Sequence, residues 1–282
     1  PSLHVSLPVC GDAGDLIRKL ICAAKLRGAD ETNPLFKGRD WIRQCQVWKQ
    51  KYPVVTAKHY ETVEEGCTNI YAFYEELSKA MQEGQTLMVS VGTSRVAGSQ
   101  AFQVKKGQRF ITNPNTASMG FCLPAATGIC VAQPGKPVVC VTGEGSLQMN
   151  IQEMATAVAL ELPVTLCILN NGYLGNVRQW QELFFNKRYS STCLRYRRRC
   201  NRDCQNPDKC CPKYSPDFVK LAESYDAKGI RVTKPEEIRP AFEAARANTN
   251  GPTVIEFFID PTANVFPMVP GGKSLNDMIL DC

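Results

Sequence analysis

The chain has 282 residues, 44% of them hydrophobic and 21% charged, a composition typical of a globular protein rather than a disordered one. Its formal net charge of +6 is small and comes largely from one arginine-rich stretch, so the charge does not indicate a nucleic-acid partner. No apolar run reaches the roughly 18 to 20 residues that span a bilayer, and the N-terminus has no signal-peptide pattern. We therefore predict a cytoplasmic protein that binds neither membrane nor nucleic acid.

The first 60 residues carry too few regular elements to form a core of their own. Leu3, Val5 and Leu7 alternate as in a strand, and apolar residues at helical spacing follow. We interpret residues 1–28 as the C-terminal remnant of a preceding central domain. Residues 29–60 are predicted to be a linker with one short helix that packs its tryptophans onto a neighbouring domain.

From residue 61 onward, predicted helices and strands alternate. The expected elements are a helix over 63–81, a strand over 87–91, a helix opened by residues 116–120, a strand–turn–helix–strand–loop–helix segment over 138–185, helices over 216–224 and 235–247, and strands over 229–232 and 253–258. Such alternation is typical of a parallel sheet covered by helices. We predict an α/β fold with a doubly wound, mostly parallel sheet and helices on both faces, in one domain over 61–282.

The 14 cysteines fall largely into two groups. Six lie in apolar patterns and are predicted to be small buried side chains in a reducing compartment: Cys10, Cys22, Cys122, Cys130, Cys140 and Cys167. Five lie in an insert over residues 193–213 that also contains five arginines: Cys193, Cys200, Cys204, Cys210 and Cys211. Four thiolates could bind zinc or an iron–sulfur cluster. Their spacing matches no standard metal-binding knuckle, so a loop without metal is the alternative.

The segment 138–185 places polar loops directly after two apolar strands. Gly143-Glu144-Gly145-Ser146 follows the first strand, and Asn170-Asn171-Gly172-Tyr173 follows the second. Parallel strands end at one edge of a sheet, so both loops face one crevice. Glycines let the backbone approach phosphate oxygens, and a helix N-terminus adds amide donors. Magnesium prefers oxygen ligands, which an acid and amides provide. We predict a divalent metal that holds a diphosphate. A βα turn with an incidental acid is the alternative.

The spacing of these two loops resembles the signature of thiamine-diphosphate enzymes. Three runs, over residues 148–189, 214–245 and 254–280, look like the catalytic large subunit of acetolactate (acetohydroxyacid) synthase. The resemblance covers about residues 85–280 apart from the insert, and residues 1–20 look like the end of that family's central domain. It implies the thiamine-diphosphate-binding fold.

The resemblance also implies roles for individual residues. The metal ligands would be Glu144, Asn171 and the carbonyl of Tyr173. The cofactor-binding residues would be Thr93, Ser94, Met119, Gly143, Gly145, Ser146, Asn171, Tyr173, Leu174 and Gly175. Met119 matches the bulky residue beneath the cofactor, while Val177 and Trp180 match positions that line the substrate pocket; these three are the candidate catalytic residues.

Several positions depart from the family pattern. Glu144 stands where the family has an aspartate, and keeps a hard oxygen ligand on a longer side chain. The loop Gly92-Thr93-Ser94-Arg95 stands where acetolactate synthases carry Gly-Gln-His, and Asn176 where a methionine is common. Parts of the first half look more like thiamine-diphosphate proteins of surface-polysaccharide gene clusters, so the cofactor is better indicated than the substrate.

By resemblance, the activity is decarboxylation of pyruvate and carboligation to a second 2-oxo acid in branched-chain amino acid biosynthesis, with thiamine diphosphate and Mg²⁺. The family's glutamate that contacts the cofactor's aminopyrimidine lies in a separate pyrimidine-binding domain, for which this chain offers no candidate. We therefore expect a homo-oligomer or a partner chain carrying that domain, little activity from this chain alone, and no FAD in this segment. The alternatives are a 2-oxo-acid decarboxylase, a polysaccharide-cluster enzyme with the same cofactor, and a non-catalytic cofactor-binding subunit or fragment.

Overall fold

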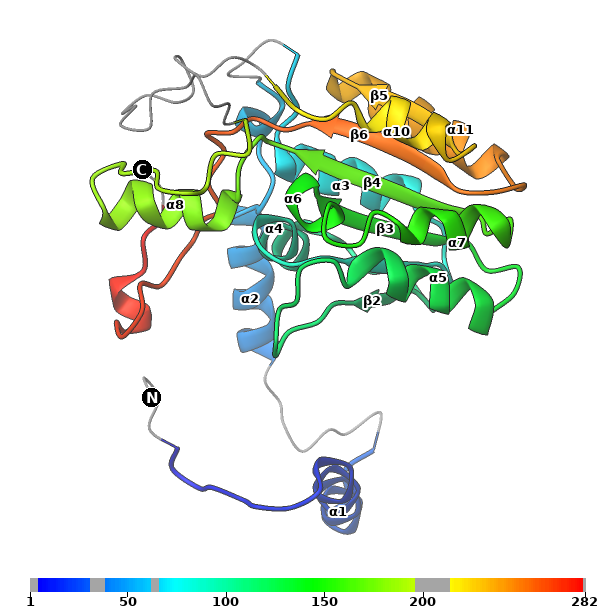
Figure 1. The fold of residues 1–282 in the computed structure, drawn as a ribbon. Coiled ribbons are helices and arrows are strands. Elements are labelled where there is room, and N and C mark those ends of the chain that lie inside the picture. Colours follow the sequence, from blue (N-terminus) through cyan, green and yellow to red (C-terminus); the bar gives the residue numbers. More distant parts are fainter. Residues whose placement is uncertain (1–4, 31–38, 62–65, 196–213, 281–282) are drawn as a thin grey trace. The chain divides into compact units, whose positions relative to one another are not determined.

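The computed structural model describes residues 5–30, 39–61, 66–195 and 214–280. It divides into two compact units, one formed by Pro1–Pro53 with Phe266–Cys282 and one formed by Val54–Val265. Helices α1 (Ala13–Leu26) and α2 (Arg39–Lys51) and the short 3-10 helix η3 (Leu275–Asp277) belong to the first unit. The second unit contains the sheet and its covering helices (Figure 1).

The first unit contains the predicted helices, but residues 5–9, the described part of the predicted strand, are irregular. Helix α1 begins after Asp12, whose carboxylate accepts a hydrogen bond from the backbone N–H of Asp15 at 2.8 Å. Described residues 5–9 form no strand, and Val5 and Leu7 are 62% and 80% exposed. The alternating pattern was therefore misleading in this part, because alternation makes a strand only where another strand pairs with it.

The second unit contains a six-stranded sheet in the order β2-β1-β3-β4-β6-β5, with every neighbouring pair parallel. Its strands are β1 (Thr86–Val89), β2 (Arg109–Ile111), β3 (Val138–Gly143), β4 (Val164–Asn170), β5 (Lys228–Val232) and β6 (Thr253–Phe258). The central strands are rich in buried valine, leucine and isoleucine, as expected for a sheet covered on both faces.

Helices cover both faces of this sheet. One face packs against α3 (Ile70–Ala80), α4 (Thr93–Ala101) and α11 (Ile238–Ala247), and the other against α5 (Cys122–Ala132), α7 (Glu153–Ala159) and α10 (Phe218–Ser224) (Figure 1). Successive strand residues point to opposite faces, so Val139 and Val141 join the first core while Val138 and Cys140 join the second. The predicted doubly wound α/β fold is confirmed.

Several element boundaries differ from the predicted ones. Helix α3 begins at Ile70 rather than 63, because the Asn69 side chain accepts a hydrogen bond from Tyr71 N at 2.8 Å and caps the helix. Residues 62–65 lie outside the described residues. The residues after Gly92, predicted as a loop, form α4, and strand β2 was not predicted.

The helix predicted after Gly143 is two short helices, α6 (Glu144–Leu147) and α7. The turn between them brings Asn150 back to the neighbouring loop, where its Nδ2 donates to the carbonyl of Gly120 at 3.1 Å. The helix is therefore interrupted at Asn150, and the Asn150 side chain contacts the backbone just before α5.

The cysteines follow the prediction only within the sheet domain. Cys122, Cys130, Cys140 and Cys167 are buried, as predicted, whereas Cys10 and Cys22 are exposed. The prediction was wrong for these two because α1 buries none of its residues and residue 10 precedes it in irregular chain. Of the insert cysteines, Cys193 is half-buried, and the other four lie outside the described residues.

Candidate functional site

A cavity of about 280 Å³ lies at the carboxyl ends of the strands, where the loops after β1, β3 and β4 meet. The strand order reverses between β1 and β3: α4 leads from β1 to β2 on one side, and α5 then leads from β2 across to β3 on the other side of β1. The two helices cover opposite faces of the sheet. Open α/β sheets bind their ligands at such a switch point. All sequence-predicted site residues line this cavity except Trp180: Thr93, Ser94, Met119, Gly143, Glu144, Gly145, Ser146, Asn171, Tyr173, Leu174, Gly175 and Val177.

Glu144 and Asn171, the two side chains predicted to bind a metal, converge on a single donor. The backbone N–H of Tyr173 donates to Glu144 Oε1 at 3.1 Å and to Asn171 Oδ1 at 2.9 Å. Strand register brings this about, since β3 and β4 pair Gly143 with Leu169. A carboxylate oxygen and an amide oxygen therefore face each other at the strand ends.

Glu144 is 2% exposed, and its environment acts on its charge in two directions. Burial raises the pKa of this carboxyl group to about 7, while backbone N–H groups, including that of Tyr173, lower it. A cation placed between Glu144 and Asn171 would replace the solvent that the buried carboxylate has lost. The site is therefore chemically suited to a hard cation.

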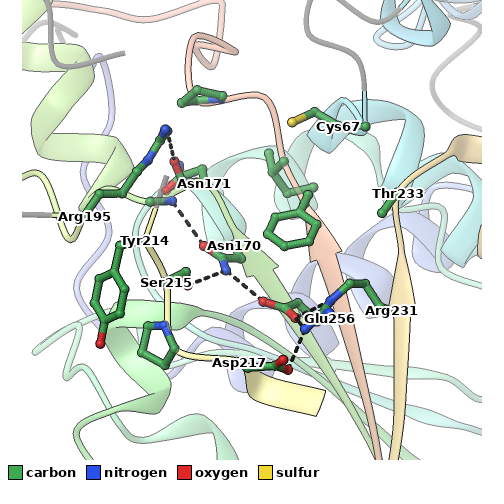
Figure 2. Close-up of a pocket in the computed structure, with 16 residues that line it drawn as sticks. Cys67, Asn170, Asn171, Arg195, Tyr214, Ser215, Asp217, Arg231, Thr233 and Glu256 are labelled. Atoms are coloured by element: carbon green, nitrogen blue, oxygen red, sulfur yellow. Dashed lines mark hydrogen bonds and ion pairs between the residues drawn. The ribbon is translucent and has the colours of Figure 1, made fainter. Parts of the chain in front are cut away.

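Two arginines contact the loop Asn170-Asn171-Gly172-Tyr173, here called the 170–173 loop. The guanidinium groups of Arg178 and Arg195 lie 5.4 and 5.2 Å from the centre of the Tyr173 ring. Arg195 also donates through Nη2 to the Asn171 carbonyl at 3.2 Å (Figure 2). Gly172 has a φ of +73°, and a Cβ there would lie 2.2 Å from Arg195 Nε, so this position requires glycine.

The wall formed by α4 and α8 (Gly175–Phe184) is suited to phosphate oxygens. The hydroxyl of Thr93, at the start of α4, is buried and has no hydrogen-bond partner among the described residues. A Cβ on Gly175, at the start of α8, would lie 2.7 Å from that hydroxyl and 2.6 Å from Asn171 Nδ2. The cavity thus ends in an unused hydroxyl and two helix N-termini, all able to donate to an anion.

The remaining predicted residues have different surroundings. Ser146 Oγ lies 2.7 Å from Ser90 Oγ and accepts from Gly120 N at 3.0 Å, so it ties three loops together. The Met119 methyl group lies 3.7 Å from where a Cβ on Gly145 would be. Val177 lines the cavity although it is 40% exposed, whereas Trp180 is exposed and does not line it.

The residues present therefore fit a metal–diphosphate group better than a metal bound by protein alone. Among the described residues, no three His, Cys, Asp or Glu side chains form a metal-binding group. Glu144, Asn171 and the Tyr173 carbonyl together carry one negative charge, which leaves positions for ligand oxygens around a cation. The donors near Thr93 and Gly175 would meet the anionic part of the same ligand.

Fold and site together define a parallel α/β domain with a cavity at its switch point, lined by groups that can donate to an anion. A model of the family described as "Thiamine pyrophosphate enzyme, C-terminal TPP binding domain" matches residues 90–257, and the chain belongs to this family. The family resemblance that the sequence motifs predicted is thereby confirmed.

Curated relatives are acetolactate synthase large subunits. The chain is 31% identical over 281 residues to acetolactate synthase isozyme 3 large subunit of Escherichia coli (strain K12), a match to 99% of this chain and 45% of that protein. It is 32% identical over 275 residues to the acetolactate synthase large subunit of Corynebacterium glutamicum, a match to 98% of this chain and 40% of that protein. The chain thus spans less than half the length of these relatives.

A solved structure with the same fold is the Rhodococcus jostii RHA1 thiamine diphosphate-dependent 4-hydroxybenzoylformate decarboxylase. It matches with a TM-score of 0.59 and 24% sequence identity, over 72% of this chain and 34% of that one. This likeness supports the fold. In the part of the chain that the structure describes, every helix is too short or too polar to cross a membrane.

Some cavity residues were missed by sequence reasoning. Gly92 and Asn176 adjoin predicted residues and could have been included on that ground. Ile70 begins α3 and Ile259 directly follows β6, and only the folded sheet brings them to the cavity. Arg195 was missed because it belongs to the arginine-rich insert, where a single useful arginine cannot be distinguished from its neighbours.

Proposed function

We propose that this chain binds thiamine diphosphate together with Mg²⁺ in the cavity at the strand ends, as the diphosphate-binding part of an acetolactate-synthase-like transferase. The observation that carries the proposal is the convergence of Glu144 Oε1 and Asn171 Oδ1 on the Tyr173 N–H, beside the unpartnered hydroxyl of Thr93. Membership of the thiamine pyrophosphate enzyme family supports the choice of cofactor.

Each part of the cavity has a separate task in this proposal. Glu144, Asn171 and the Tyr173 carbonyl hold the cation, while the Thr93 hydroxyl and the N–H groups that begin α4 and α8 donate hydrogen bonds to the diphosphate. When bound, thiamine diphosphate supplies the carbon nucleophile that attacks a 2-oxo acid. Met119, which lies over Gly145, supports the cofactor's rings, and Val177 provides an apolar wall that excludes water from the reacting carbon.

The reaction of the whole enzyme is proposed from its relatives. Pyruvate would lose carbon dioxide, and the remaining two-carbon unit would join a second 2-oxo acid. The printed names of the curated relatives favour this reaction. We further propose that the protein acts in an oligomer or with a partner that contributes the pyrimidine-binding domain.

Calorimetric titration of the chain with thiamine diphosphate, with and without Mg²⁺, tests the proposed function. We expect binding that requires the metal, and at least a tenfold weaker affinity for Glu144→Ala, since a charged ligand of the cation is lost. Glu236→Ala is the matched control because Glu236 is an exposed carboxylate outside the cavity, and it should bind like the wild type. Metal-independent binding, or equal binding by Glu144→Ala, would remove the basis of the proposal.

A 2-oxo-acid decarboxylase with the same cofactor is the second candidate. It is favoured by the Thr93-Ser94 pair in the cavity, at positions where the resemblance to acetolactate synthases implies Gln and His. Product analysis with pyruvate alone and with 2-oxobutyrate, on the enzyme assembled with its pyrimidine-binding domain, separates the two. Acetolactate and its 2-oxobutyrate-derived counterpart support the synthase, and acetaldehyde without either identifies a decarboxylase.

A further inference from the structure

The 170–173 loop also borders a second cavity, of about 420 Å³, which shares Asn171 and Ile259 with the proposed cofactor cavity. Figure 2 shows the side chains that line it, several of which come from β4, β5, β6 and the segment before α10. Four of them form a continuous line of hydrogen bonds and ion pairs, here called the polar chain: Asp217, Arg231, Glu256 and Asn170.

The polar chain runs from the surface to the loop. Arg231 Nη2 donates to Asp217 Oδ1 at 2.5 Å and to Glu256 Oε2 at 3.0 Å, and Nε donates to the same Glu256 oxygen at 3.1 Å. Glu256 Oε1 then accepts from Asn170 Nδ2 at 2.9 Å. The Arg231 side chain is 38% exposed, whereas Glu256 is 1% exposed.

The last contact of the polar chain lies within the loop. Asn170 Oδ1 accepts from the backbone N–H of Gly172 at 3.3 Å, which draws the backbone of the loop toward the end of β4. Asn170 is 3% exposed, and its Nδ2 also donates to Ser215 Oγ at 2.8 Å. The Asn170 side chain thus links Glu256 to the backbone between Asn171 and Tyr173.

The charge of Glu256 decides which way the Asn170 amide points. An ionised carboxylate only accepts hydrogen bonds, so the NH₂ of Asn170 must face it and the amide oxygen must face Gly172 N–H. A neutral amide in place of Glu256 could donate a hydrogen bond to Asn170 instead. The Asn170 amide could then flip, which would place its NH₂ group against the Gly172 N–H, two donors facing each other. A buried carboxylate is costly unless it is paired, and Arg231 supplies the pairing charge.

Sheet geometry makes this arrangement rigid. Arg231 and Glu256 are register partners on β5 and β6, and Glu256 pairs with Ile168 of β4, two residues before Asn170. Side chains two residues apart on a strand share a face, so Glu256 and Asn170 lie on the same face of adjacent strands. All three groups therefore depend on strand pairing rather than on loop conformation.

We propose that Glu256 is a positioning residue for the metal-binding loop: paired with Arg231 and acting through Asn170, it sets the backbone that presents Asn171 Oδ1 and the Tyr173 carbonyl to the cation. The inference rests on the proposed function. Under it, Glu256, Arg231 and Asn170 support the metal-binding residues without contacting the metal. Such outer partners orient ligands without touching the metal.

The test measures the Mg²⁺ concentration that gives half-maximal thiamine diphosphate binding to the full chain, by calorimetry. Glu256→Gln should raise this concentration about 10- to 100-fold. Ser215→Ala removes the other partner of Asn170 Nδ2 but leaves the carboxylate. Glu236→Gln makes the same carboxylate-to-amide change at an exposed residue that lines neither cavity. Both control variants should stay within threefold of the wild type.

Two further variants separate positioning from general stability. Glu256→Asp keeps an acceptor-only carboxylate and should require less Mg²⁺ than Glu256→Gln. Phe242→Leu, in the core on the face of the sheet opposite to Glu256, should lower the unfolding temperature with less than a threefold change in the Mg²⁺ requirement. Should Glu256→Gln fail to fold, Arg231→Gln provides the second route, with a rise of about tenfold expected.

The outcomes distinguish this inference from the proposed function. Wild type that binds no thiamine diphosphate at any Mg²⁺ concentration overturns the proposed function itself. Wild type that binds normally, together with Glu256→Gln that needs no more Mg²⁺, overturns only the positioning role. A double variant Glu256→Gln/Asn170→Ala that needs more Mg²⁺ than Asn170→Ala alone shows that Glu256 does not act through Asn170.

Discussion

At Glu144, the requirements of folding oppose those of ligand binding. Its carboxyl group is almost fully buried, and burial raises its pKa to about 7 from a usual 4.5. The folded protein therefore binds a proton at this position more tightly than the unfolded chain does. An uncharged side chain would be more stable at this buried position, because an unpaired buried charge is costly. A bound cation would pair with the carboxylate and offset that cost.

We predict that Glu144→Gln stabilises the ligand-free protein at pH 8 but not at pH 4.5. Between pH 4.5 and 7 the unfolded chain loses the Glu144 proton while the folded protein keeps it, so the wild type loses stability as pH rises and the loss is complete above pH 7. The difference in unfolding free energy between variant and wild type should grow by about 3 kcal/mol at most over this range. Denaturant unfolding in EDTA at several pH values measures it.

Metal addition provides the control for that prediction. With Mg²⁺ and thiamine diphosphate present, the cation stabilises the charged carboxylate, so the wild type should gain more stability from the ligands at pH 8 than the variant does. A pH dependence that is identical in wild type and variant without ligands would show that Glu144 titrates as an ordinary exposed acid.

Local sequence predicted the cavity residues of two loops, because a glycine turn and paired asparagines follow strands directly, and the family resemblance supplied the others that were predicted. Three features could not be predicted from either. The buried hydroxyl of Thr93 depends on the approach of Gly175 from another helix, and the orientation of Asn170 depends on Glu256, 86 residues later in the chain. Arg195 contacts Tyr173 only because the chain returns beside Gly172, where Leu194 N donates to the Gly172 carbonyl at 2.9 Å.

At the scale of elements, β5 and α10 approach each other so closely that their contact requires a glycine. A Cβ on Gly229 would lie 2.8 Å from Val219 Cγ1 and 2.9 Å from the Val219 carbonyl oxygen. We predict that Gly229→Ala lowers the free energy of unfolding by about 1–3 kcal/mol, since backbone atoms must move to admit the methyl group. Denaturant unfolding measures this change, and a circular dichroism spectrum without denaturant checks that the variant is folded.

Gly128→Ala is the same substitution as Gly229→Ala, but we expect it to raise the free energy of unfolding rather than lower it. Gly128 is exposed within α5, and a Cβ there would meet nothing within 4 Å. The change should raise the free energy of unfolding by roughly 0.5–1 kcal/mol, because alanine loses less backbone entropy in a helix. Equal effects of the two substitutions would mean that the β5–α10 contact is looser than its geometry indicates.

The elements were predictable where their signals are strong and local. Alternation of apolar strands with helices predicted the parallel sheet, and β6 begins and ends as expected at Thr253 and Phe258. Strand β2 has three residues, none of them fully buried, and so has no apolar run to reveal it. Helix α4 begins with polar and small residues that also suit a loop, and its helical state depends on packing against α3 and the sheet.

At the scale of the whole molecule, topology concentrates the chemistry at one edge. The loops after β1, β3 and β4 come from segments about 25 to 80 residues apart, yet parallel strand order brings them to one cavity. The same sheet continues through β6 and β5. Glu256 of β6, paired with Arg231 of β5, accepts a hydrogen bond from Asn170 in the 170–173 loop. The sheet therefore serves both to form the cavity and to fix the loop that would hold the metal.

We predict that the 282-residue chain by itself binds Mg²⁺ and thiamine diphosphate but forms no measurable acetolactate from pyruvate. The chain spans 45% and 40% of the length of two acetolactate synthase large subunits that it resembles. By family resemblance, the glutamate that contacts the aminopyrimidine ring belongs to a separate domain, so we expect these 282 residues to bind the diphosphate end of the cofactor without supplying the acid that acts on the other end. Acetolactate is measured after incubation with pyruvate, Mg²⁺ and cofactor.

Two comparisons make the absence of product informative. The acetolactate synthase isozyme 3 large subunit of Escherichia coli, assayed in parallel with its own cofactors, should form acetolactate, and calorimetry on the same sample of this chain should show bound thiamine diphosphate. Acetolactate from this chain alone would mean that its own residues activate the aminopyrimidine end, provided that Glu144→Ala abolishes the product. The search for that residue would then begin among the cavity-lining residues that sequence reasoning missed, first with Asn176, a polar residue next to Val177 in the chain.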